Sequence, residues 1–577
     1  LIIIGGFFVL PVNAQAAELG EQVNFYVDSN YDISGRNQLN AELKVIGNFI
    51  YFYVEIDYYN RLNITQKSLL KEKLKDLANE FDQVIYPKER AIFGSEWSPG
   101  IDNDVKITVL VSELVSDAGG YFNTFDEYPR SQVFESNERE MIYLNVLSIF
   151  NPKNKSFLAH EFQHLISFYQ KTKLYGLEEE VWLNEARSEY APTVCGYNDK
   201  YVDSYLANRV DTFLDEPSDS LTEWKNKVVD YGAASLFIHY LVDHYGEEVL
   251  TRMVLNNKVG IASIDKALSD LGHTETFSDI FADWSVANYL NDCQIGTENK
   301  YCYLNKNLTY QRLHTDYTVS YSGFPNLIVS RSSSIKDWLS YWYRFRQGTV
   351  QSTDRDTLKL EFTGSDNKGD FRVPYIVIDQ NNQTTVKFIS LEDQKGIAYI
   401  PNFTSLNKSV IMIPFNQYQK ENFGANESST SFTFTASSVD TLVIEDIVGD
   451  NEDNNSINDY PEGSLLRAKN DYKVYIIKGN YKRWVQSAEI FNQYEHLHWK
   501  DIIDVDLSVL DQYKESWLIR ADGDKKVYEL NADGTKHWLN MTAEQFTITG
   551  HLWDMVYITN SFERDSYTTG SDVMYGG

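Results

Sequence analysis

Cysteine is scarce in this sequence, with only Cys195, Cys293 and Cys302 among 577 residues. So few thiols exclude a scaffold held together by many disulfides, and the lack of a Cys-x-x-Cys motif argues against a zinc–thiolate site. Cys293 and Cys302 are close enough in sequence to pair in an oxidising compartment. Pairing depends on the geometry of their Cβ atoms, so the sequence leaves it open. We expect Cys195 to be buried and unreactive.

Basic residues are also in short supply. The chain has 52 Lys and Arg against 83 Asp and Glu, which gives a formal net charge of −31. A chain this acidic repels phosphates, so we expect no nucleic-acid partner. Solubility in a salty or calcium-containing medium is the interpretation we favour, and attraction to basic substrates is the alternative.

Long apolar runs are lacking as well, since no segment approaches the 18 apolar residues of a membrane-spanning helix. The apolar segment Leu1–Leu10 is about ten residues long, which is too short to span a bilayer. Followed by Ala14-Gln15-Ala16, it is typical of a signal peptide and its cleavage site, with a buried strand as the alternative. We expect residues 1–17 to be a signal peptide truncated at its start, and the protein to be secreted or held at the cell surface.

What the sequence does contain is ample material for packed domains, with 42% hydrophobic and 14% aromatic residues. Residues 22–60, 105–111 and 141–146 carry strand-like patterns, and residues 65–84 have the apolar spacing of a helix. From 154 to 290 the spacing is helical. Strands first and helices afterwards favour an α+β domain over an alternating one.

The second half favours β-structure. Residues 305–446 contain short alternating strands between turn residues, which predicts a β-sandwich domain. An acidic linker, 447–462, follows, and its Asp and Asn density suits Ca²⁺ although it lacks the full EF-hand loop.

The last part of the chain is a tandem repeat, with repeat 1 at 463–515 and repeat 2 at 516–577. Leu466-Arg467-Ala468 matches Ile519-Arg520-Ala521 at an offset of 53, and later matches are offset by 54 to 55. Repeats of this length are structural modules, and we find no catalytic pattern in them. A cell-surface or extracellular ligand is the partner that such modules suit.

One motif carries chemistry: His160-Glu161-Phe162-Gln163-His164. No Gly or Pro occurs between 153 and 173, so a helix is expected, and two imidazoles four residues apart share one face and can bind one ion. Glu161 is then placed beside a metal-bound water. A chance match, or two structural histidines, is the alternative interpretation.

A third ligand is needed for a catalytic zinc. The metzincin pattern places Gly at 167 and His at 170, but this chain has Ser167 and Gln170. Glu185, within Trp182-Leu183-Asn184-Glu185-x-x-Ser188-Glu189-Tyr190, lies 21 residues after His164 and can return to the metal from a second helix. With this Asn-Glu pair after the His-Glu-x-x-His helix, the sequence resembles the gluzincins, most closely the secreted hyicolysin-like peptidases and more distantly thermolysin.

The resemblance implies a zincin-like catalytic domain over 18–300, one catalytic Zn²⁺, and roles for individual residues. His160, His164 and Glu185 correspond to zinc ligands, Glu161 to the general base, and Glu189 to the acid that orients a ligand histidine. Glu189 as the ligand itself, or in a surface salt bridge, are alternatives. Ala186 departs from the small residue, often Gly, that follows the Asn-Glu pair in relatives.

The donor that stabilises the transition state is harder to place. Tyr231 is our candidate, because a Tyr-Gly pair that opens a helix recurs in gluzincins, although a structural role is the alternative among 40 tyrosines. We expect His239 and His244 to be packing or surface residues.

The expected function is a secreted, monomeric zinc endopeptidase acting on protein or peptide substrates. We expect the strand Met141–Val146 to dock extended substrate by β-addition. One alternative is a surface adhesin or scaffold with a relict zinc site, and another is an aminopeptidase, although Gly119-Gly120-Tyr121-Phe122 does not match the glycine-rich motif of that class. Whether residues 18–60 form a pro-segment is open.

Overall fold

The computed structural model divides the chain into two compact units, residues 1–441 and 442–577. It describes residues 17–116, 118–313, 318–348, 355–403, 405–439 and, with short gaps, 460–574; these gaps are 461–462, 470, 480, 495–496, 506, 511, 532, 543–544, 547–550 and 552. The expected signal peptide and acidic linker, including its suggested calcium ligands, therefore lie outside the described residues apart from Ala17 and Tyr460. Among the described helices, none combines the length and the apolar character needed to cross a bilayer.

The first unit opens with a mixed six-stranded sheet in the order β1-β2-β3-β4-β6-β5. The central strands β3, β4 and β6 are parallel to each other, and the remaining pairs are antiparallel. The strands are β1 (Gln22–Tyr26), β2 (Gln38–Ile46), β3 (Ile50–Glu55), β4 (Ile107–Ser112), β5 (Gly120–Phe122) and β6 (Met141–Asn145). The parallel strands are buried on both faces, because alternate side chains enter two different cores. Phe52, Val109 and Ile142 belong to the core shared with the helices, and Tyr53, Leu110 and Tyr143 to a second core that includes Phe25 and Leu39.

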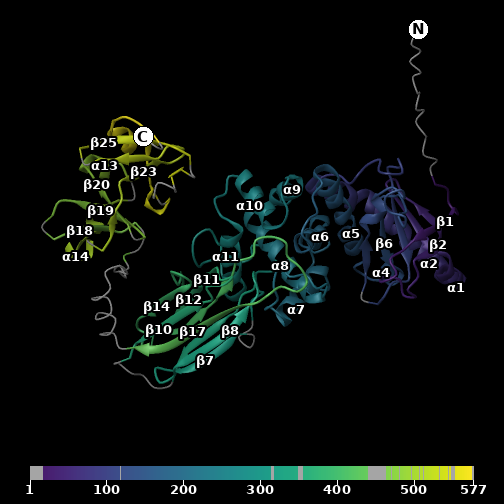
Figure 1. Cartoon of the computed structure of the whole chain (residues 1–577), viewed down its shortest axis with the longest axis horizontal. Coiled ribbons are helices and arrows are strands. Elements are labelled where there is room, and N and C mark those ends of the chain that lie inside the picture. Colours follow the sequence, from purple (N-terminus) through teal and green to yellow (C-terminus); the bar gives the residue numbers. More distant parts are fainter. Residues whose placement is uncertain are drawn as a thin grey trace, which may run out of the picture. The chain divides into compact units, whose positions relative to one another are not determined.

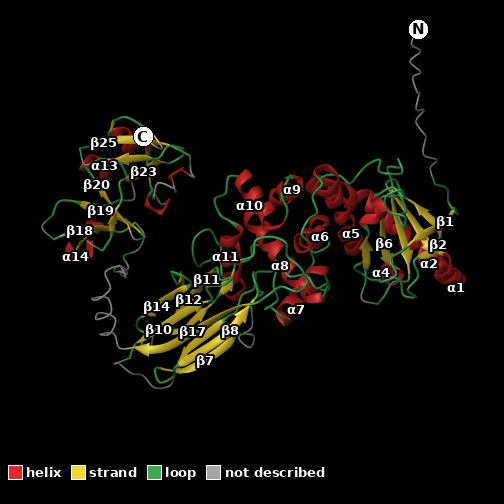
Figure 2. Cartoon of the chain, viewed as in Figure 1, coloured by secondary structure: helices red, strands yellow, loops and turns green. Residues whose placement is uncertain are grey.

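Most of the helices follow the sheet, as the sequence predicts, and three of them occupy the connection between β3 and β4, where the sequence predicts a helix at 65–84. The helices are α1 (Ile56–Arg61), α2 (Ile64–Glu80), α3 (Tyr86–Phe93), α4 (Val146–Phe150), α5 (Asn154–Ser167), α6 (Val181–Cys195), α7 (Tyr205–Asp215), α8 (Val228–Tyr245), α9 (Glu248–Leu255), α10 (Gly260–Asp270) and α11 (Phe277–Leu290), with π-helical turns η1 (Phe81–Ile85) and η3 (Phe168–Lys173) and a 3₁₀ turn η2 (Thr124–Glu127). Helix α5 packs against β5 and β6 on one side and α6 on the other, and α6 packs in turn on α8. These helices thus lie between the sheet and the β-rich part of the unit (Figures 1 and 2).

The β-rich part of the first unit consists of two main sheets around one core. One sheet has the order β14-β10-β17-β8, the other β13-β12-β15-β9-β7, and a short pair joins β11 to β16. Their bounds are β7 (Val319–Phe324), β8 (Val329–Ile335), β9 (Tyr343–Gln347), β10 (Thr357–Gly364), β11 (Phe371–Arg372), β12 (Pro374–Asp379), β13 (Thr384–Phe388), β14 (Lys395–Ile400), β15 (Asn407–Met412), β16 (Phe415–Asn416) and β17 (Thr430–Val439). Leu360 and Phe434 from the first sheet pack with Val410 from the second. Exposure alternates along β17, as expected for a strand with one face on a core.

The helical and β-rich parts share a core, although the sequence suggests a domain boundary at 300–305. Trp338 is 1% exposed, and its ring lies 4.6 Å from that of Phe277 and 5.4 Å from that of Phe281, measured between centroids. Its indole N–H donates to the Gln419 carbonyl at 2.7 Å. Trp342 donates to the Ser285 carbonyl at 3.0 Å. The two parts are therefore compacted into one unit.

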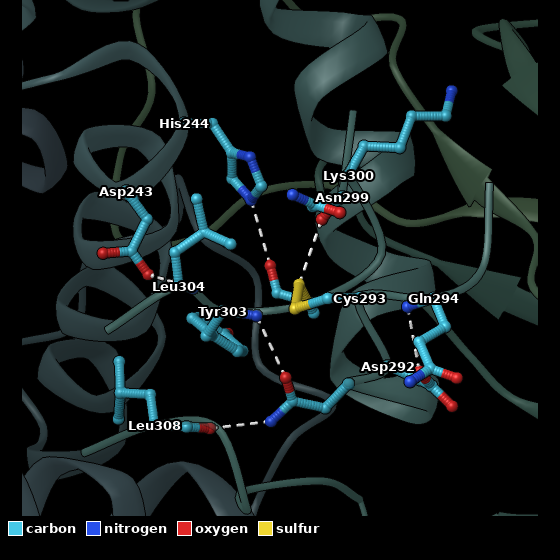
Figure 3. The surroundings of a disulfide bond; sticks show 12 residues. Asp243, His244, Asp292, Cys293, Gln294, Asn299, Lys300, Tyr303, Leu304 and Leu308 are labelled. Atoms are coloured by element: carbon cyan, nitrogen blue, oxygen red, sulfur yellow. Dashed lines mark hydrogen bonds between the residues drawn. A yellow bond between two sulfur atoms is a disulfide. The ribbon is translucent and has the colours of Figure 1, made fainter. Parts of the chain in front are cut away.

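Cys293 and Cys302 form a disulfide, which answers the question that the sequence leaves open (Figure 3). The bond closes the loop that follows α11, and this loop lies on the C-terminal half of α8. His244 donates to the Cys302 carbonyl at 3.0 Å, and Asp243 accepts from the Leu304 backbone at 2.8 Å. Cys195 is buried and free, and its thiol donates to Glu89.

The second unit contains two sheets of the same topology, one in each predicted repeat. The first has the order β21-β18-β19-β20-β22 and the second β26-β23-β24-β25-β27, with the same parallel and antiparallel pairs in both. The strands are β18 (Leu465–Ala468), β19 (Val474–Lys478), β20 (Tyr481–Val485), β21 (Ile502–Val505), β22 (Lys514–Glu515), β23 (Leu518–Ala521), β24 (Tyr528–Leu530), β25 (Thr535–Asn540), β26 (Tyr557–Thr559), β27 (Thr568–Thr569) and β28 (Val573–Met574). Lys482 and Lys536 make equivalent hydrogen bonds in the two repeats. Each donates to the backbone carbonyl of the residue 28 positions later, Leu510 and Arg564.

The two repeats are joined through a buried ion pair between Arg483 of β20 and Glu563 of α16 (Ser561–Ser566), with exposed side-chain fractions of 3% and 0%. Tyr494 and Tyr567 also donate to the Glu563 carboxylate. Apolar residues of both repeats, such as Val485 and Ile519, share one core. The repeats therefore pack as a pair.

Replacing Trp338 tests whether the helical and β-rich parts depend on one core. Trp338→Ala should lower the free energy of unfolding of the first unit by about 3–5 kcal/mol, because it removes a buried indole and leaves a cavity. Denaturant titration of the full chain measures this loss, with Tyr310→Ala, at a side chain that is 86% exposed, as the matched control. A loss no greater than that of the control would contradict the shared core.

Candidate metal centre

Helix α5 places the two histidines of the His-Glu-x-x-His motif at one end of the buried interface with α6. Its residues from Leu158 to Ser167 are all buried, so the helix is held by packing on both sides. His160 and His164 are one turn apart and 6% and 7% exposed. Their Nε2 atoms lie 3.2 Å from each other.

Helix α6 places the Glu185 carboxylate beside these two nitrogens. Glu185 Oε2 lies 3.2 Å from His160 Nε2 and 3.5 Å from His164 Nε2. Ligand atoms about 2.05 Å from a tetrahedral zinc are about 3.3 Å apart, so the three separations match such an ion. Glu185 Oε2 is buried and receives no hydrogen bond from the described part of the chain. The structure thus brings His160, His164 and Glu185 into a group that can hold a metal ion.

Glu189 lies one turn further along α6 and is 0% exposed. Its Oε1 is 3.5 Å from Nδ1 of His160, on the side of the ring away from the converging Nε2 atoms. Arg209 donates to both Glu189 oxygens at 2.8 Å, and the Tyr205 hydroxyl donates to Oε1 at 2.9 Å. The geometry therefore fits an orienting carboxylate, and full burial argues against a surface salt bridge.

His164 has its own orienting partner, Ser188. The Ser188 hydroxyl donates to Gln163 Oε1 at 2.6 Å, and its oxygen lies 3.2 Å from His164 Nδ1. Since the Nδ1 of each histidine faces an acceptor, the proton of each neutral ring belongs on Nδ1, and both Nε2 lone pairs point to the centre. The sequence prediction missed Ser188, Tyr205 and Arg209; only Ser188 lies inside a recognisable motif.

Glu161 is 7% exposed and neighbours the metal-binding group. Burial raises the pKa of Glu161 to about 8, against the opposing effect of His164. A bound dication would favour the ionised form and lower this pKa. Gly120 of β5 lies directly on Glu161: a Cβ atom there would be 3.1 Å from Glu161 Cγ and 2.6 Å from the Tyr143 carbonyl oxygen, so a larger residue would not fit.

The prediction that the strand Met141–Val146 docks substrate is wrong. Its counterpart β6 lies inside the sheet and is paired with β4 on one side and β5 on the other. Its backbone donors and acceptors are therefore used within the sheet. Strand β5 is the edge next to Glu161, and the described residues provide no second strand beside it.

Tyr231, in the first turn of α8, is brought to the metal-binding group. Its ring centroid lies 6.4 Å from that of His160, and the Arg209 guanidinium is 4.7 Å from its ring centroid. Burial, followed by the charges of Glu185 and Glu189, holds the pKa of Tyr231 well above its usual range. The hydroxyl is therefore a permanent donor, and in this structure it donates to Asn226 Oδ1 at 3.0 Å.

Asn226 also connects this site to the N-terminal loop. Its amide lowers the pKa of the Tyr31 hydroxyl, and Tyr31 lies on the loop between β1 and β2. The Tyr31 ring stacks on Tyr121 of β5 at 4.5 Å between centroids. Burial, Asp28, Glu161 and Glu185 raise the pKa of Tyr31, which places this hydroxyl within the electrostatic reach of the centre. No sequence motif signalled Tyr31 or Asn226.

The other two histidines of α8 lie outside the site. His239 is fully buried and bonds to the Ser235 carbonyl at 2.7 Å and to Thr193 at 2.8 Å. Burial lowers the pKa of His239 to about 4. His244 binds the Cys302 carbonyl. Both are packing residues in this fold.

No protein-family model matches the chain, and no curated protein matches it. Among solved structures, the pre-peptidase C-terminal domain of the collagenase from Bacillus anthracis is 6% identical over 21% of this chain and 93% of its own, with a TM-score of 0.15. The Yersinia pseudotuberculosis-derived mitogen is 12% identical over 23% of this chain and 97% of its own, with a TM-score of 0.14. A family GH115 4-O-methyl-α-glucuronidase, BtGH115A, is 10% identical over 57% and 51%, with a TM-score of 0.12. Likenesses this weak support no statement about fold or activity.

Removing the charge of Glu189 tests its orienting role. Glu189→Gln should weaken zinc binding about 10–100-fold, because the carboxylate that fixes the His160 tautomer is lost. Competition with a chelator measures the dissociation constant. Glu179→Gln is the matched control, because Glu179 is another buried carboxylate paired with an arginine, Arg187 at 2.7 Å, but it contacts none of the candidate ligands. Equal losses in both variants would contradict the assignment.

Proposed function

We propose that the protein is a zinc-dependent endopeptidase that is secreted or held at the cell surface. The observation that carries this proposal is the convergence of His160 Nε2, His164 Nε2 and Glu185 Oε2 at 3.2–3.5 Å, with Glu161 beside them. Three nitrogen and oxygen ligands with one open position are typical of catalytic rather than structural zinc. The mixed sheet followed by helices supports a zincin-like domain of the gluzincin type.

Each residue of the site has a role in this proposal. A zinc ion held by the three ligands would supply a Lewis acid that polarises the peptide carbonyl and acidifies water. Glu161 accepts the proton of the attacking water and passes it to the leaving amine. Tyr231 turns from Asn226 to donate to the carbonyl oxygen as negative charge develops there. Arg209 holds the Glu189 carboxylate in place beside His160.

The edge strand β5 is the proposed docking site for substrate. An extended peptide that pairs with Gly120–Phe122 would pass beside Glu161, because Gly120 is in contact with that side chain. This places a peptide bond of the substrate interior at the metal-binding group, which favours endopeptidase activity. The Cys293–Cys302 disulfide supports an oxidising, extracellular location.

Replacing the general base tests the proposal most directly. Glu161→Gln should keep zinc bound, because no ligand changes, but abolish cleavage of casein and of peptides blocked at the N-terminus. Metal analysis and peptide mass spectrometry measure the two properties on the same preparation. Unchanged cleavage by the variant would refute the assignment, and cleavage restricted to unblocked peptides would favour an aminopeptidase.

Removing the Tyr231 hydroxyl tests the transition-state donor. Tyr231→Phe should lower kcat about 10²–10³-fold and leave KM nearly unchanged, because the bond strengthens only as charge develops on the oxygen. Tyr197→Phe is the control, since the Tyr197 hydroxyl donates to Glu80 at 2.9 Å and contacts none of the candidate site residues. A change in KM alone would make Tyr231 a binding residue rather than a donor.

A further inference from the structure

A second group of acidic side chains meets apart from the histidines, at Asp102, Glu127 and Glu140. Asp102 belongs to the loop between α3 and β4, Glu127 ends η2, and Glu140 precedes β6. Contacts at hydrogen-bonding distance join the Glu140 carboxyl to both Asp102 and Glu127. Three carboxyl groups, one from the α3–β4 loop and two from the connection between β5 and β6, are thus in one chain of contacts.

Two members of this acidic cluster, Glu127 and Glu140, are buried and short of donors. Glu127 is 0% and Glu140 2% exposed. Neither oxygen of Glu127 nor Oε2 of Glu140 has a hydrogen-bond donor within the described part of the chain. Glu140 Oε1 accepts from the Ile101 backbone N–H at 2.7 Å, and the partly exposed Asp102 accepts from the Asp104 backbone N–H at 2.9 Å. Buried carboxylates without donors are costly, so something else must compensate this charge.

The neighbouring Asp126 shows how a buried carboxylate is usually satisfied, by hydrogen-bond donors of the protein. It is also 0% exposed, but it accepts hydrogen bonds from the Asn137 backbone and amide at 2.9 and 2.8 Å and from the Tyr143 hydroxyl at 2.7 Å. Glu127, the next residue, has none of these. Its carboxylate faces another carboxylate instead of a donor.

The cations near the cluster do not bind its carboxylates directly. Lys173 donates to the backbone carbonyl of Glu127 at 2.7 Å, and its ammonium lies 3.9 Å from the centroid of the Trp97 ring. Arg139 is 5.5 Å from the ring centroids of Phe25 and Tyr53 and acts on Asp102 only through its charge. Burial raises the pKa of both Glu127 and Glu140, so, with only these indirect cations among the described residues, the pair needs either a proton or a further cation.

We propose that this cluster binds a calcium ion, with Glu127 and Glu140 as direct ligands and Asp102 adding negative charge on the other side of Glu140. All available side-chain ligands are oxygens, which hard cations prefer and which soft metals do not select. The loop is shaped around the carboxylate: Gly100 has φ +81, and a Cβ atom there would lie 1.7 Å from Glu140 Oε2.

The ion would stabilise the wall of the candidate active site. It would hold together two parts of the segment between β5 and β6, and β5 is the strand in contact with Glu161. Phe168, directly after α5, packs on Phe122 and Tyr128 from that same segment, with ring centroids 5.8 and 5.9 Å apart. The calcium site is independent of the proposed peptidase activity.

Calcium titration of the full, zinc-loaded chain tests this proposal by calorimetry and thermal unfolding. In the wild type, calcium at about 100 times its dissociation constant should raise the Tm by about 3 °C. The double variant Glu127→Gln/Glu140→Gln should lose this shift and the tight calorimetric binding. Glu89→Gln is the matched control, because Glu89 is equally buried, at 0% exposure, but has no carboxyl neighbour and should respond to calcium like the wild type.

A second measurement does not depend on the double variant. Terbium bound at the cluster should show luminescence sensitised by Trp97, lost in Trp97→Phe and displaced by calcium. Absence of both a Tm shift and sensitised luminescence in the wild type would overturn the proposal and indicate that Glu127 and Glu140 share a proton. Undiminished tight calcium binding by the double variant would also overturn it, because the ion would then bind elsewhere.

Discussion

The approach of Glu185 to His160 and His164 is the constraint on which the centre of this molecule depends. Two lone pairs and a carboxylate oxygen are brought to within 3.5 Å of one another in a buried interface. Without a cation, such a convergence is unfavourable, because each group loses water and gains no donor. The surrounding packing of α5 on α6 and of α6 on α8 supplies the burial that holds the three atoms in place.

Buried acidic groups are handled in two contrasting ways in the first unit. Glu189 is paired with Arg209 and accepts a hydrogen bond from Tyr205, and Asp126 accepts hydrogen bonds from an amide and a hydroxyl. Paired in this way, a buried carboxylate becomes a rigid positioning element. Glu185 and Glu127, in contrast, carry oxygens that no donor satisfies within the described residues, and these are the two places where we propose a metal ion.

The packing of the helical part on the β-rich part explains why the first unit does not divide near residue 300. Trp338 and Trp342 come from the β-rich part but bury their rings against α11. The disulfide and the loop after α11 fix the far end of α8, whose first turn carries Tyr231. The β-rich part therefore packs on α11, and α11 in turn contacts α8, the helix that carries Tyr231.

Local patterns were enough to predict some features of this protein. The His160–His164 spacing depends only on helical periodicity. The tandem repeat is visible because similar residues recur at offsets of 53 to 55, and the two sheets have the same strand order. The order of strands, helices and then β-structure also follows from local periodicity. The position of Glu185 was inferred by resemblance to a family rather than by any local rule.

Tertiary structure alone decided the rest, because these features join residues that no local pattern connects. Arg209 and Tyr205 reach Glu189 from another helix, and Tyr31 reaches the site from a loop almost 200 residues before Asn226. Strand β6 has the composition of a strand that could pair with substrate, but it lies between β4 and β5. The three-residue edge strand β5 is therefore the one that we propose for substrate docking. The same holds for Asp102, Glu127 and Glu140, which come together only when the loop before β4 meets the connection between β5 and β6. Periodicity determines which face of an element is apolar, whereas the neighbours of that face are set by how the elements pack.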